Sequence, residues 1–289
     1  MNKNMQRYYN VNGVVTPAEE ASLKVNDLAI LRGYGIFDFF LVWEQVPLFL
    51  EDYLDRFYRS ARLLNMEVPA ERSELKRRIG ELISLNKESY AGIRLVMTGG
   101  YTSDSYTPVA PNLIVMQHPY KPFADKAYEE GVKLMTYEYQ RDLPEVKTTN
   151  YAMGIRLLPE LKKAGAVEPL YHSGGTIKEA VRSNFYIIDQ NNKVITADED
   201  ILMGITRKHV LQSIEGHYEV ERRFITLAEV WKAKEAFLTG SNKGVIPVTR
   251  LDDHVFGDGT PGEVTQAIGD LFDVHRQTYV QAHSPLLSE

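Results

Sequence analysis

The sequence predicts an α+β protein of two domains: a small domain over residues 1–117 and a larger one over residues 125–289. Three observations support this. The chain has 289 residues, whereas domains usually hold about 100–200. In its first third, strand-like runs and segments of helical periodicity follow one another. In its second half short strands dominate and few segments suit crossover helices, which disfavours a doubly wound parallel sheet.

The small domain is expected to begin with an extended stretch around residues 12–15 and a buried strand over residues 36–42, rich in Phe and Val. Residues 51–66 are predicted to form a helix, because apolar side chains recur there at helical spacing. A second helix is predicted to start at Ser73, a residue type that caps helix N-termini. Two strands and the polar loop between them complete the domain: residues 93–98, 113–117 and 99–111.

Residues 118–124 are the predicted linker, because Pro119 and Pro122 interrupt both helices and central strands. In the larger domain a helix is expected over residues 204–214. Another is expected from Thr226, where a Glu three positions later gives capping-box spacing. The expected strands are residues 132–139, a hairpin of 184–189 and 193–196, and two short strands over 236–239 and 244–249.

Composition excludes several classes of function. The 33 basic and 39 acidic side chains leave a net charge of −6, which provides no basic surface for nucleic acid. No apolar run is long enough to cross a membrane and the N-terminus lacks a secretory signal, so we expect a cytoplasmic protein. With no cysteine there is no disulfide or zinc–thiolate site, and the scattered histidines predict no metal site. Walker, Rossmann and nucleophile-elbow patterns are also absent.

Six segments of the chain carry residue types that suit one cofactor chemistry. They are Gly33–Asp38, Leu54–Arg56, Glu145–Tyr151, Thr176–Phe185, Met203–Arg207 and Thr239–Ser241. In this order they resemble the pyridoxal-phosphate (PLP) enzymes of fold type IV, which include branched-chain aminotransferases, D-amino-acid aminotransferases and aminodeoxychorismate lyases. The resemblance covers nearly the whole chain. It implies the D-amino-acid-aminotransferase-like fold, with a small α/β sandwich domain and a larger, strand-rich, PLP-binding domain.

An aldehyde cofactor must be held as a Schiff base by a lysine amine, which also moves protons. The resemblance places this lysine at Lys147. It implies that Tyr151, one helical turn further on if the segment coils, donates a hydrogen bond to the phenolic oxygen of the cofactor. It assigns Glu179 to the ring nitrogen, since a neighbouring carboxylate favours the protonated ring. The alternatives are a solvated lysine, a tyrosine half-buried in the core, and a surface glutamate beside Lys178 and Arg182.

The phosphate needs donors that are already in place, and a helix N-terminus offers backbone N–H groups and a favourable dipole. The start of the predicted helix 204–214 supplies these together with the Thr206 hydroxyl, and Arg56 can form a bidentate pair with phosphate. The alternatives are local: Thr206 caps its own helix, and Arg56 pairs with Asp52. The full cofactor-binding set that the resemblance implies is Arg56, Lys147, Tyr151, Glu179, Asn184, Ile205, Thr206 and Ser241.

Two further residues concern the substrate. Tyr34 and Arg94 match the tyrosine and arginine that branched-chain aminotransferases place around the substrate carboxylate. Arg94 also lies in an apolar strand, where a charge is costly unless it has a partner or faces a site. Residues 97–101 lack the arginine and histidine pair of D-amino-acid aminotransferases, and residues 99–104 lack the arginine of the lyases.

We therefore expect PLP-dependent transamination of an L-amino acid, branched-chain, with 2-oxoglutarate as acceptor. The alternatives are an aminodeoxychorismate lyase that releases pyruvate and 4-aminobenzoate, and a PLP-binding protein without catalysis. The expected partners are amino-acid and 2-oxo-acid substrates and a second copy of the chain, with no nucleic acid or membrane. In such a homodimer, Tyr34 or the loop 99–111 would reach the site of the other subunit.

Overall fold

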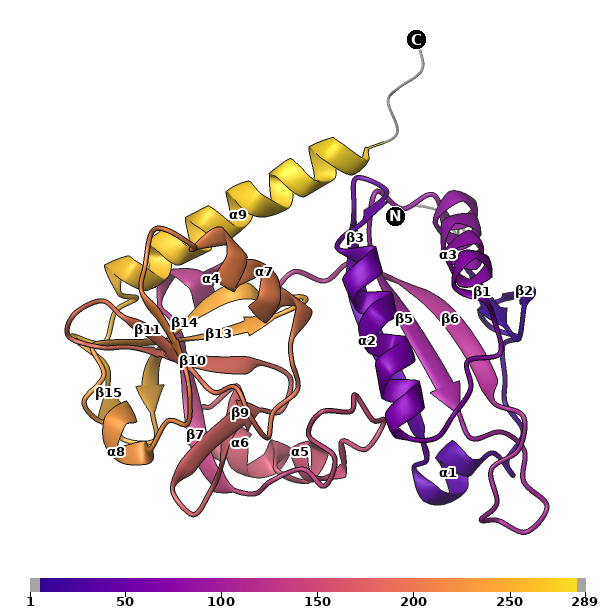
Figure 1. The fold of residues 1–289 in the computed structure, drawn as a ribbon, viewed down its shortest axis with the longest axis horizontal. Helices are drawn as coiled ribbons and strands as arrows, with labels where there is room; N and C mark the ends of the chain where they lie inside the picture. The colour runs from indigo at the N-terminus through magenta and orange to yellow at the C-terminus, as the bar shows by residue number, and fades with distance from the viewer. Residues whose placement is uncertain (1–5, 285–289) are drawn as a thin grey trace. The chain divides into compact units, whose positions relative to one another are not determined.

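The structure is a computed structural model that describes residues 6–284. The chain divides into two compact units. Among the described residues, the first contains 6–121, the short segment Val146–Asn150 and 279–284. The second contains Pro122–Glu145 and Tyr151–Thr278. Figure 1 shows the helices and strands of each.

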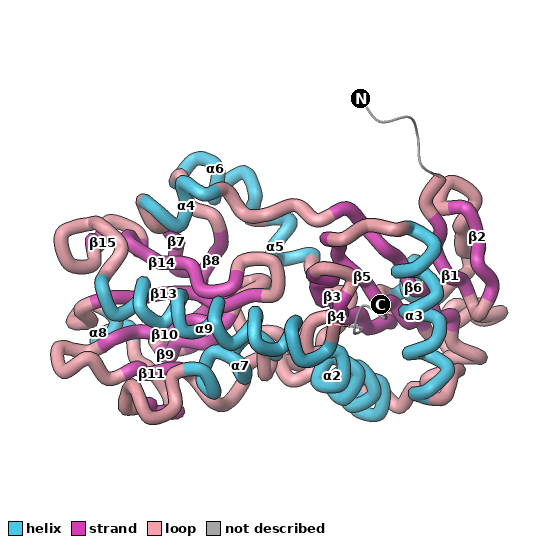
Figure 2. Tube along the Cα trace, turned by 90° about the horizontal axis from the view of Figure 1, so that it is seen from above, coloured by secondary structure: helices cyan, strands magenta, loops and turns pink. Residues whose placement is uncertain are grey.

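The first unit is a six-stranded antiparallel sheet with the strand order β2-β1-β6-β5-β3-β4. Side chains of one sheet face, such as Phe40 and Leu95, are fully buried, whereas Phe37 and Arg94 on the other face are partly exposed. Two helices, α2 and α3, lie against the buried face (Figures 1 and 2). The strands are β1 (Tyr8–Val11), β2 (Val14–Pro17), β3 (Gly35–Trp43), β4 (Val46–Pro47), β5 (Tyr90–Thr98) and β6 (Asn112–Pro119). The helices are α1 (Leu28–Arg32), α2 (Leu50–Leu63) and α3 (Arg72–Asn86).

The strands and helices predicted for this unit are present, with three corrections. The helix expected over 51–66 ends at Leu63. Helix α3 begins at Arg72, so the prediction that Ser73 caps it is wrong. Arg72 bonds to carboxylates of α2, which holds this residue at the start of the helix. Within the stretch expected to be extended around 12–15, Asn12 and Gly13 form a turn with positive φ between β1 and β2.

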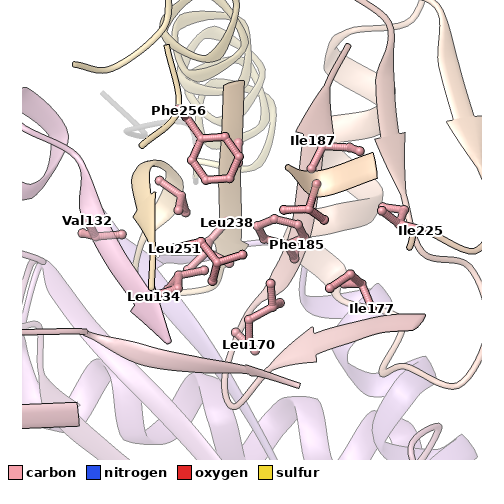
Figure 3. Packing of buried hydrophobic residues seen from close by; sticks show 14 of the residues in the cluster. Val132, Leu134, Leu170, Ile177, Phe185, Ile187, Ile225, Leu238, Leu251 and Phe256 are labelled. Carbon is pink, nitrogen blue, oxygen red and sulfur yellow. The ribbon is translucent and has the colours of Figure 1, made fainter. Parts of the chain in front are cut away.

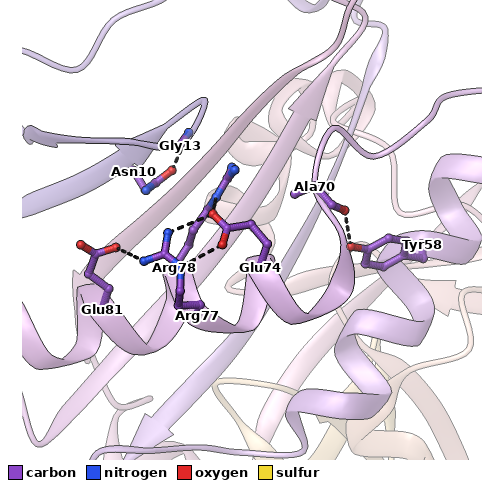
Figure 4. Close-up of polar contacts among 8 residues, drawn as sticks. All are labelled: Asn10, Gly13, Tyr58, Ala70, Glu74, Arg77, Arg78 and Glu81. Atoms are coloured by element: carbon purple, nitrogen blue, oxygen red, sulfur yellow. Dashed lines mark hydrogen bonds and ion pairs between the residues drawn. The ribbon is translucent and has the colours of Figure 1, made fainter.

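The outer surface of α3 carries a group of ion pairs. Glu74 accepts hydrogen bonds from Arg77 and Arg78, and Arg77 also reaches Glu81 (Figure 4). The two arginines lower the pKa of Glu74 to about 2. Spacings of three and four residues are typical of a solvated helix face, where such pairs add little to stability. This face carries none of the predicted site residues.

The second unit is a nine-stranded mixed sheet with the order β12-β11-β10-β13-β14-β7-β8-β9, and β15 pairs with β14. Its core joins side chains from most of these strands, among them Leu134, Leu170, Phe185, Leu238 and Leu251 (Figure 3). The strands are β7 (Val132–Glu138), β8 (Glu168–Ser173), β9 (Thr176–Ala180), β10 (Asn184–Ile188), β11 (Val194–Thr196), β12 (Val220–Arg222), β13 (Glu235–Gly240), β14 (Gly244–Leu251) and β15 (His254–Val255). The helices are α4 (Asp125–Glu129), α5 (Ala152–Arg156), α6 (Leu158–Ala164), α7 (Ile205–Ser213), α8 (Leu227–Val230) and α9 (Glu263–His283).

Several predictions for this unit are confirmed. The hairpin is β10 paired with β11, and the helix expected from Gly204 is α7. Thr226 and Glu229 form the predicted capping box, although α8 has only four residues. Strands β8 and β9 and the long helix α9 were not predicted. No helix within residues 6–284 is long and apolar enough to cross a membrane.

The division into units differs from the predicted boundaries in three places. His118 and Pro119, expected in a linker, pair with β5 at the end of β6. Residues 146–150 belong to the first unit because they run along β3. The end of α9 also belongs there, where the Tyr279 ring lies 4.7 Å from that of Phe49.

Candidate active site

Lys147 lies in an extended segment beside β3 in the first unit. The backbone N–H of Phe37 donates to the Lys147 carbonyl at 2.9 Å, and the N–H of Thr149 donates to the Gly35 carbonyl at 3.0 Å. A Cβ on Gly35 would lie 2.9 Å from a β5 carbonyl and 3.3 Å from the Thr149 hydroxyl, so this close approach requires glycine. Because the segment is extended, Tyr151 does not follow Lys147 by one helical turn; it is the residue that precedes α5.

The structure brings Lys147 and Arg94 to the same aromatic ring. The Lys147 Nζ lies 4.8 Å from the centre of the Phe37 ring, and the Arg94 guanidinium carbon lies 5.2 Å from it. The Arg94 guanidinium also lies 5.6 Å from the Phe39 ring. These contacts suit cations that keep part of their hydration. Two positive charges over one ring make this position of the partly exposed sheet face favourable for an anion.

Arg56 is held by a buried carboxylate that was not predicted as its partner. The Nε and Nη2 atoms of Arg56 donate to the two oxygens of Asp38 at 2.9 and 2.6 Å, a bidentate arrangement. The Asp38 side chain is fully buried and that of Arg56 is 9% exposed. The sequence signal was present, because Asp38 is the charged residue inside an otherwise apolar strand. The pair fixes the orientation of the Arg56 guanidinium.

Tyr34 follows Gly33, the left-handed residue that ends α1. Its hydroxyl donates to the backbone carbonyl of Leu64, just beyond the end of α2. Burial raises the Tyr34 pKa, so the phenol stays protonated. A substrate carboxylate would therefore have to compete with this carbonyl for the hydroxyl proton.

Glu179 lies on β9 in the second unit and is buried, so the alternative of a surface glutamate is wrong. Its Oε1 accepts hydrogen bonds from Nε and Nη2 of Arg141 at 2.9 and 2.7 Å, and its Oε2 accepts from the N–H of Leu202 at 3.0 Å. Arg141 was not predicted to have a role. Its only sequence signal is a position six residues before Lys147, which does not reveal this partner.

The loop before α7 is held from two sides. Asn184 donates from its side-chain amide to the Leu202 carbonyl at 2.8 Å, while Glu179 accepts from the N–H of the same residue. Gly204 is the N-cap and provides no side-chain hydrogen bond to the helix. The alternative that Thr206 caps α7 is therefore wrong: Thr206 is the second helical residue, buried beside Ile205.

Ser241 stands in the turn between β13 and β14. Strand β13 pairs with β10 so that Thr239 faces Asn184 across the ladder. The turn thus begins at Ser241, two residues beyond the partner of Asn184. Within the second unit, Asn184 and the turn containing Ser241 therefore lie at the same end of the paired strands β10 and β13, and Asn184 and Glu179 both bond to Leu202 in the loop that leads into α7.

A comparison with known protein families identifies the family of this chain. The model of the amino-transferase class IV family matches residues 35–251, which include nine of the ten predicted site residues. The chain belongs to the class IV aminotransferases. This confirms the resemblance, the fold and the enzymatic nature that the sequence implied, and it does not favour a lyase or a non-catalytic protein.

Two relatives and one solved structure show how broad the similarity is. The chain is 27% identical to a D-alanine aminotransferase of Bacillus licheniformis, over 89% of this chain and 93% of the relative. It is 28% identical to a putative branched-chain-amino-acid aminotransferase of Methanocaldococcus jannaschii, over 91% of this chain and 94% of the relative. The branched-chain amino acid aminotransferase of T.th., solved with pyridoxamine 5'-phosphate, is 25% identical with a TM-score of 0.88, covering 96% of this chain and 98% of that one.

The cofactor of this class IV aminotransferase is PLP. The residues present fit it. A Cβ on Gly204 would lie 2.1 Å from the Asn184 amide oxygen, so glycine allows the loop to pass close to that side chain at the start of α7. This start has no side-chain cap, which suits binding of a phosphate. In the same unit, Glu179 is a buried carboxylate.

Proposed function

We propose that this class IV aminotransferase transfers the amino group of a branched-chain L-amino acid to 2-oxoglutarate. The observation that carries the proposal is the position of Arg94, whose guanidinium lies over the rings of Phe37 and Phe39 on a partly exposed sheet face. A guanidinium binds a carboxylate, and the neighbouring rings offer apolar surface to an aliphatic side chain. The similarity to branched-chain aminotransferases supports the same substrate class.

In this proposal Tyr34 and Arg94 contact the substrate, and the other predicted residues hold the cofactor. When bound, PLP supplies an aldehyde that takes up amines and a ring that withdraws electrons. The Lys147 amine holds the cofactor, is released by the substrate amine, and then moves a proton between two carbons that lie within its reach. Glu179 keeps the ring nitrogen protonated. The phosphate is bound by Ile205 and Thr206 at the start of α7, by the Arg56 guanidinium and by the Ser241 hydroxyl. Tyr151 donates to the phenolic oxygen of the cofactor, and Asn184 completes the cofactor-binding set.

The lysine assignment is tested by trapping. Reduction of the purified enzyme with borohydride should leave a stable PLP adduct, which peptide mass spectrometry should locate on Lys147. The Lys147→Ala variant should fold as the wild type does and lose turnover by about a thousandfold or more, because both the covalent anchor and the proton carrier are gone. An adduct on another lysine, or substantial activity in this variant, would refute the assignment.

A second candidate is transamination of D-alanine, which the similarity to the Bacillus licheniformis enzyme favours. The cofactor chemistry is the same and Lys147 moves the proton in both, so the two candidates differ in where the site accepts the substrate carboxylate and where it accepts the substrate side chain. Purified enzyme should therefore be assayed with L-leucine, L-valine and D-alanine against 2-oxoglutarate. Glutamate formation from the L-amino acids supports the first proposal, and activity confined to D-alanine supports the second.

We also propose that the enzyme is a homodimer in the cytoplasm, as the resemblance implied. Light scattering on the purified protein should then give twice the chain mass of 32.9 kDa. A mass of one chain would refute the dimer.

A further inference from the structure

The second unit contains a buried ion pair that no predicted role uses. Lys243 and Glu168 are 3% and 1% exposed. The Lys243 Nζ donates to the Glu168 Oε1 and, at 2.8 Å, to the hydroxyl of Ser183. The remaining Glu168 oxygen accepts the backbone N–H of Arg182 at 3.1 Å. Lysine and glutamate are almost never fully buried unless paired, so this pair has a specific structural cause.

The electrostatics of the pair require both partners. Burial alone raises the Glu168 pKa, but the charges of Lys243 and Arg182 and their hydrogen bonds outweigh it and hold the pKa below its usual value. Burial lowers the Lys243 pKa, and Glu168 opposes this. Removal of one partner would leave an uncompensated charge in the interior, whereas removal of both would not.

The pair connects the turn that contains Ser241 to the segment that follows Glu179. Lys243 lies in that turn, and its backbone carbonyl accepts a hydrogen bond from the Tyr128 hydroxyl at 2.7 Å. Its amine contacts Ser183, in the tight turn closed by the bridge between Ala180 and Ser183. A Cβ on Gly240 would lie 3.3 Å from the Arg182 carbonyl, so the two turns are in close backbone contact.

We propose that Lys243 and Glu168 are positioning residues for the phosphate subsite of the cofactor. This rests on the proposed role of Ser241 as a phosphate donor. The pair holds the turn around Ser241 at a fixed distance from the segment 179–184, so that its hydroxyl is in place before the phosphate arrives. A donor displaced by less than an ångström loses most of its hydrogen bond, and supporting residues are what prevent such displacement.

The test separates phosphate recognition from general stability. The full-length protein, freed of cofactor, is titrated with PLP and with pyridoxal, which lacks the phosphate. The readout is the dissociation constant of pyridoxal divided by that of PLP, which measures how much the phosphate adds to binding. In Lys243→Met and Glu168→Gln, PLP should bind about tenfold more weakly while pyridoxal binding changes less than about twofold, so the ratio falls.

Two further variants keep the test decisive. Glu235→Gln is the matched control, because Glu235 is a buried carboxylate of the same unit that accepts from the backbone of α9. It should lower stability and leave the ratio unchanged. If Lys243→Met does not fold, Ser183→Ala removes one contact of the same amine and should lower the ratio by about twofold to fivefold.

The outcomes distinguish this inference from the proposed function. A wild-type ratio well above one that stays unchanged in the variants of the pair overturns the inference alone. A wild-type enzyme that binds PLP no better than pyridoxal overturns both the inference and the proposed phosphate donors. A fall in the ratio for the control as large as for the pair would also overturn the inference, because it would show a general loss of structure.

Discussion

Neutralising Asp38 should destabilise the first unit strongly, because Arg56 would lose the carboxylate that compensates its charge. The variant Asp38→Asn keeps the size of the side chain and one acceptor oxygen. It removes the negative charge and replaces one acceptor with an NH₂ group that faces the guanidinium. The original contacts of 2.9 and 2.6 Å to the two carboxylate oxygens therefore cannot both remain.

The magnitude follows from burial. The two side chains are 0% and 9% exposed, so solvent cannot take over the role of the carboxylate. Removing one partner of a buried ion pair lowers the free energy of unfolding by about 3–5 kcal/mol. Because asparagine retains one acceptor oxygen, we expect a loss of about 3 kcal/mol. At about 2–4 °C per kcal/mol, the melting temperature should fall by about 6–12 °C.

The assay is thermal unfolding of both variants followed by circular dichroism. Asp55→Asn is the matched control, because Asp55 also pairs with an arginine but is 67% exposed, and its partner Arg72 is 36% exposed. Exposed pairs contribute about 0–1 kcal/mol, so this control should melt within about 4 °C of the wild type. If Asp38→Asn melts together with the control, the argument from burial is refuted.

Three other changes test the site, the core and the dependence on pH. Glu179→Gln should fold and bind PLP, but turnover should fall about a hundredfold, since a neutral amide no longer favours the protonated ring; unchanged turnover would contradict this role. Phe185→Ala should lower the free energy of unfolding by about 3–5 kcal/mol in urea titrations, because Phe185 is 1% exposed in the hydrophobic core of the second unit. A loss below about 1 kcal/mol would show that the core closes around the gap. Burial holds the His275 pKa below its usual 6.5, so the unfolded chain binds more protons below that pH and stability should fall as pH drops from about 7 to 5. This fall should be smaller in His275→Asn, and an equal fall in both proteins would exclude His275 as its source.

Local sequence signals predicted the elements that depend on local chemistry. Strand β3 is a long run of apolar residues, and α7 follows a glycine that permits the turn before it. The capping box at Thr226 needs only two side chains three positions apart. Each of these features lies within a few residues, so its prediction did not require knowledge of the packing.

The missed elements depend on packing between distant segments. Strand β9 contains Lys178 and Glu179, which indicate a surface when taken alone, yet both are buried because Asp200 and Arg141 pair with them. Helix α9 contains Gly269, which lowers helix propensity. It begins where the Glu235 carboxylate accepts N–H groups of its first turn. Figure 2 shows that α9 then passes over strands of the second unit.

Arg56 shows why a site residue can be predicted from sequence although its contact partner cannot. On sequence spacing alone Asp52 is the obvious partner, since it lies four residues away on the same helix. Such a pair in water contributes only about 0.3–0.5 kcal/mol, which is too little to hold an arginine in the interior. A buried guanidinium needs a carboxylate that is buried with it, and Asp38 on β3 meets that condition because α2 packs against the same face of the sheet. The charged residue that interrupts an apolar strand is therefore the better guide to the partner of a buried arginine than the nearest acid on its own helix.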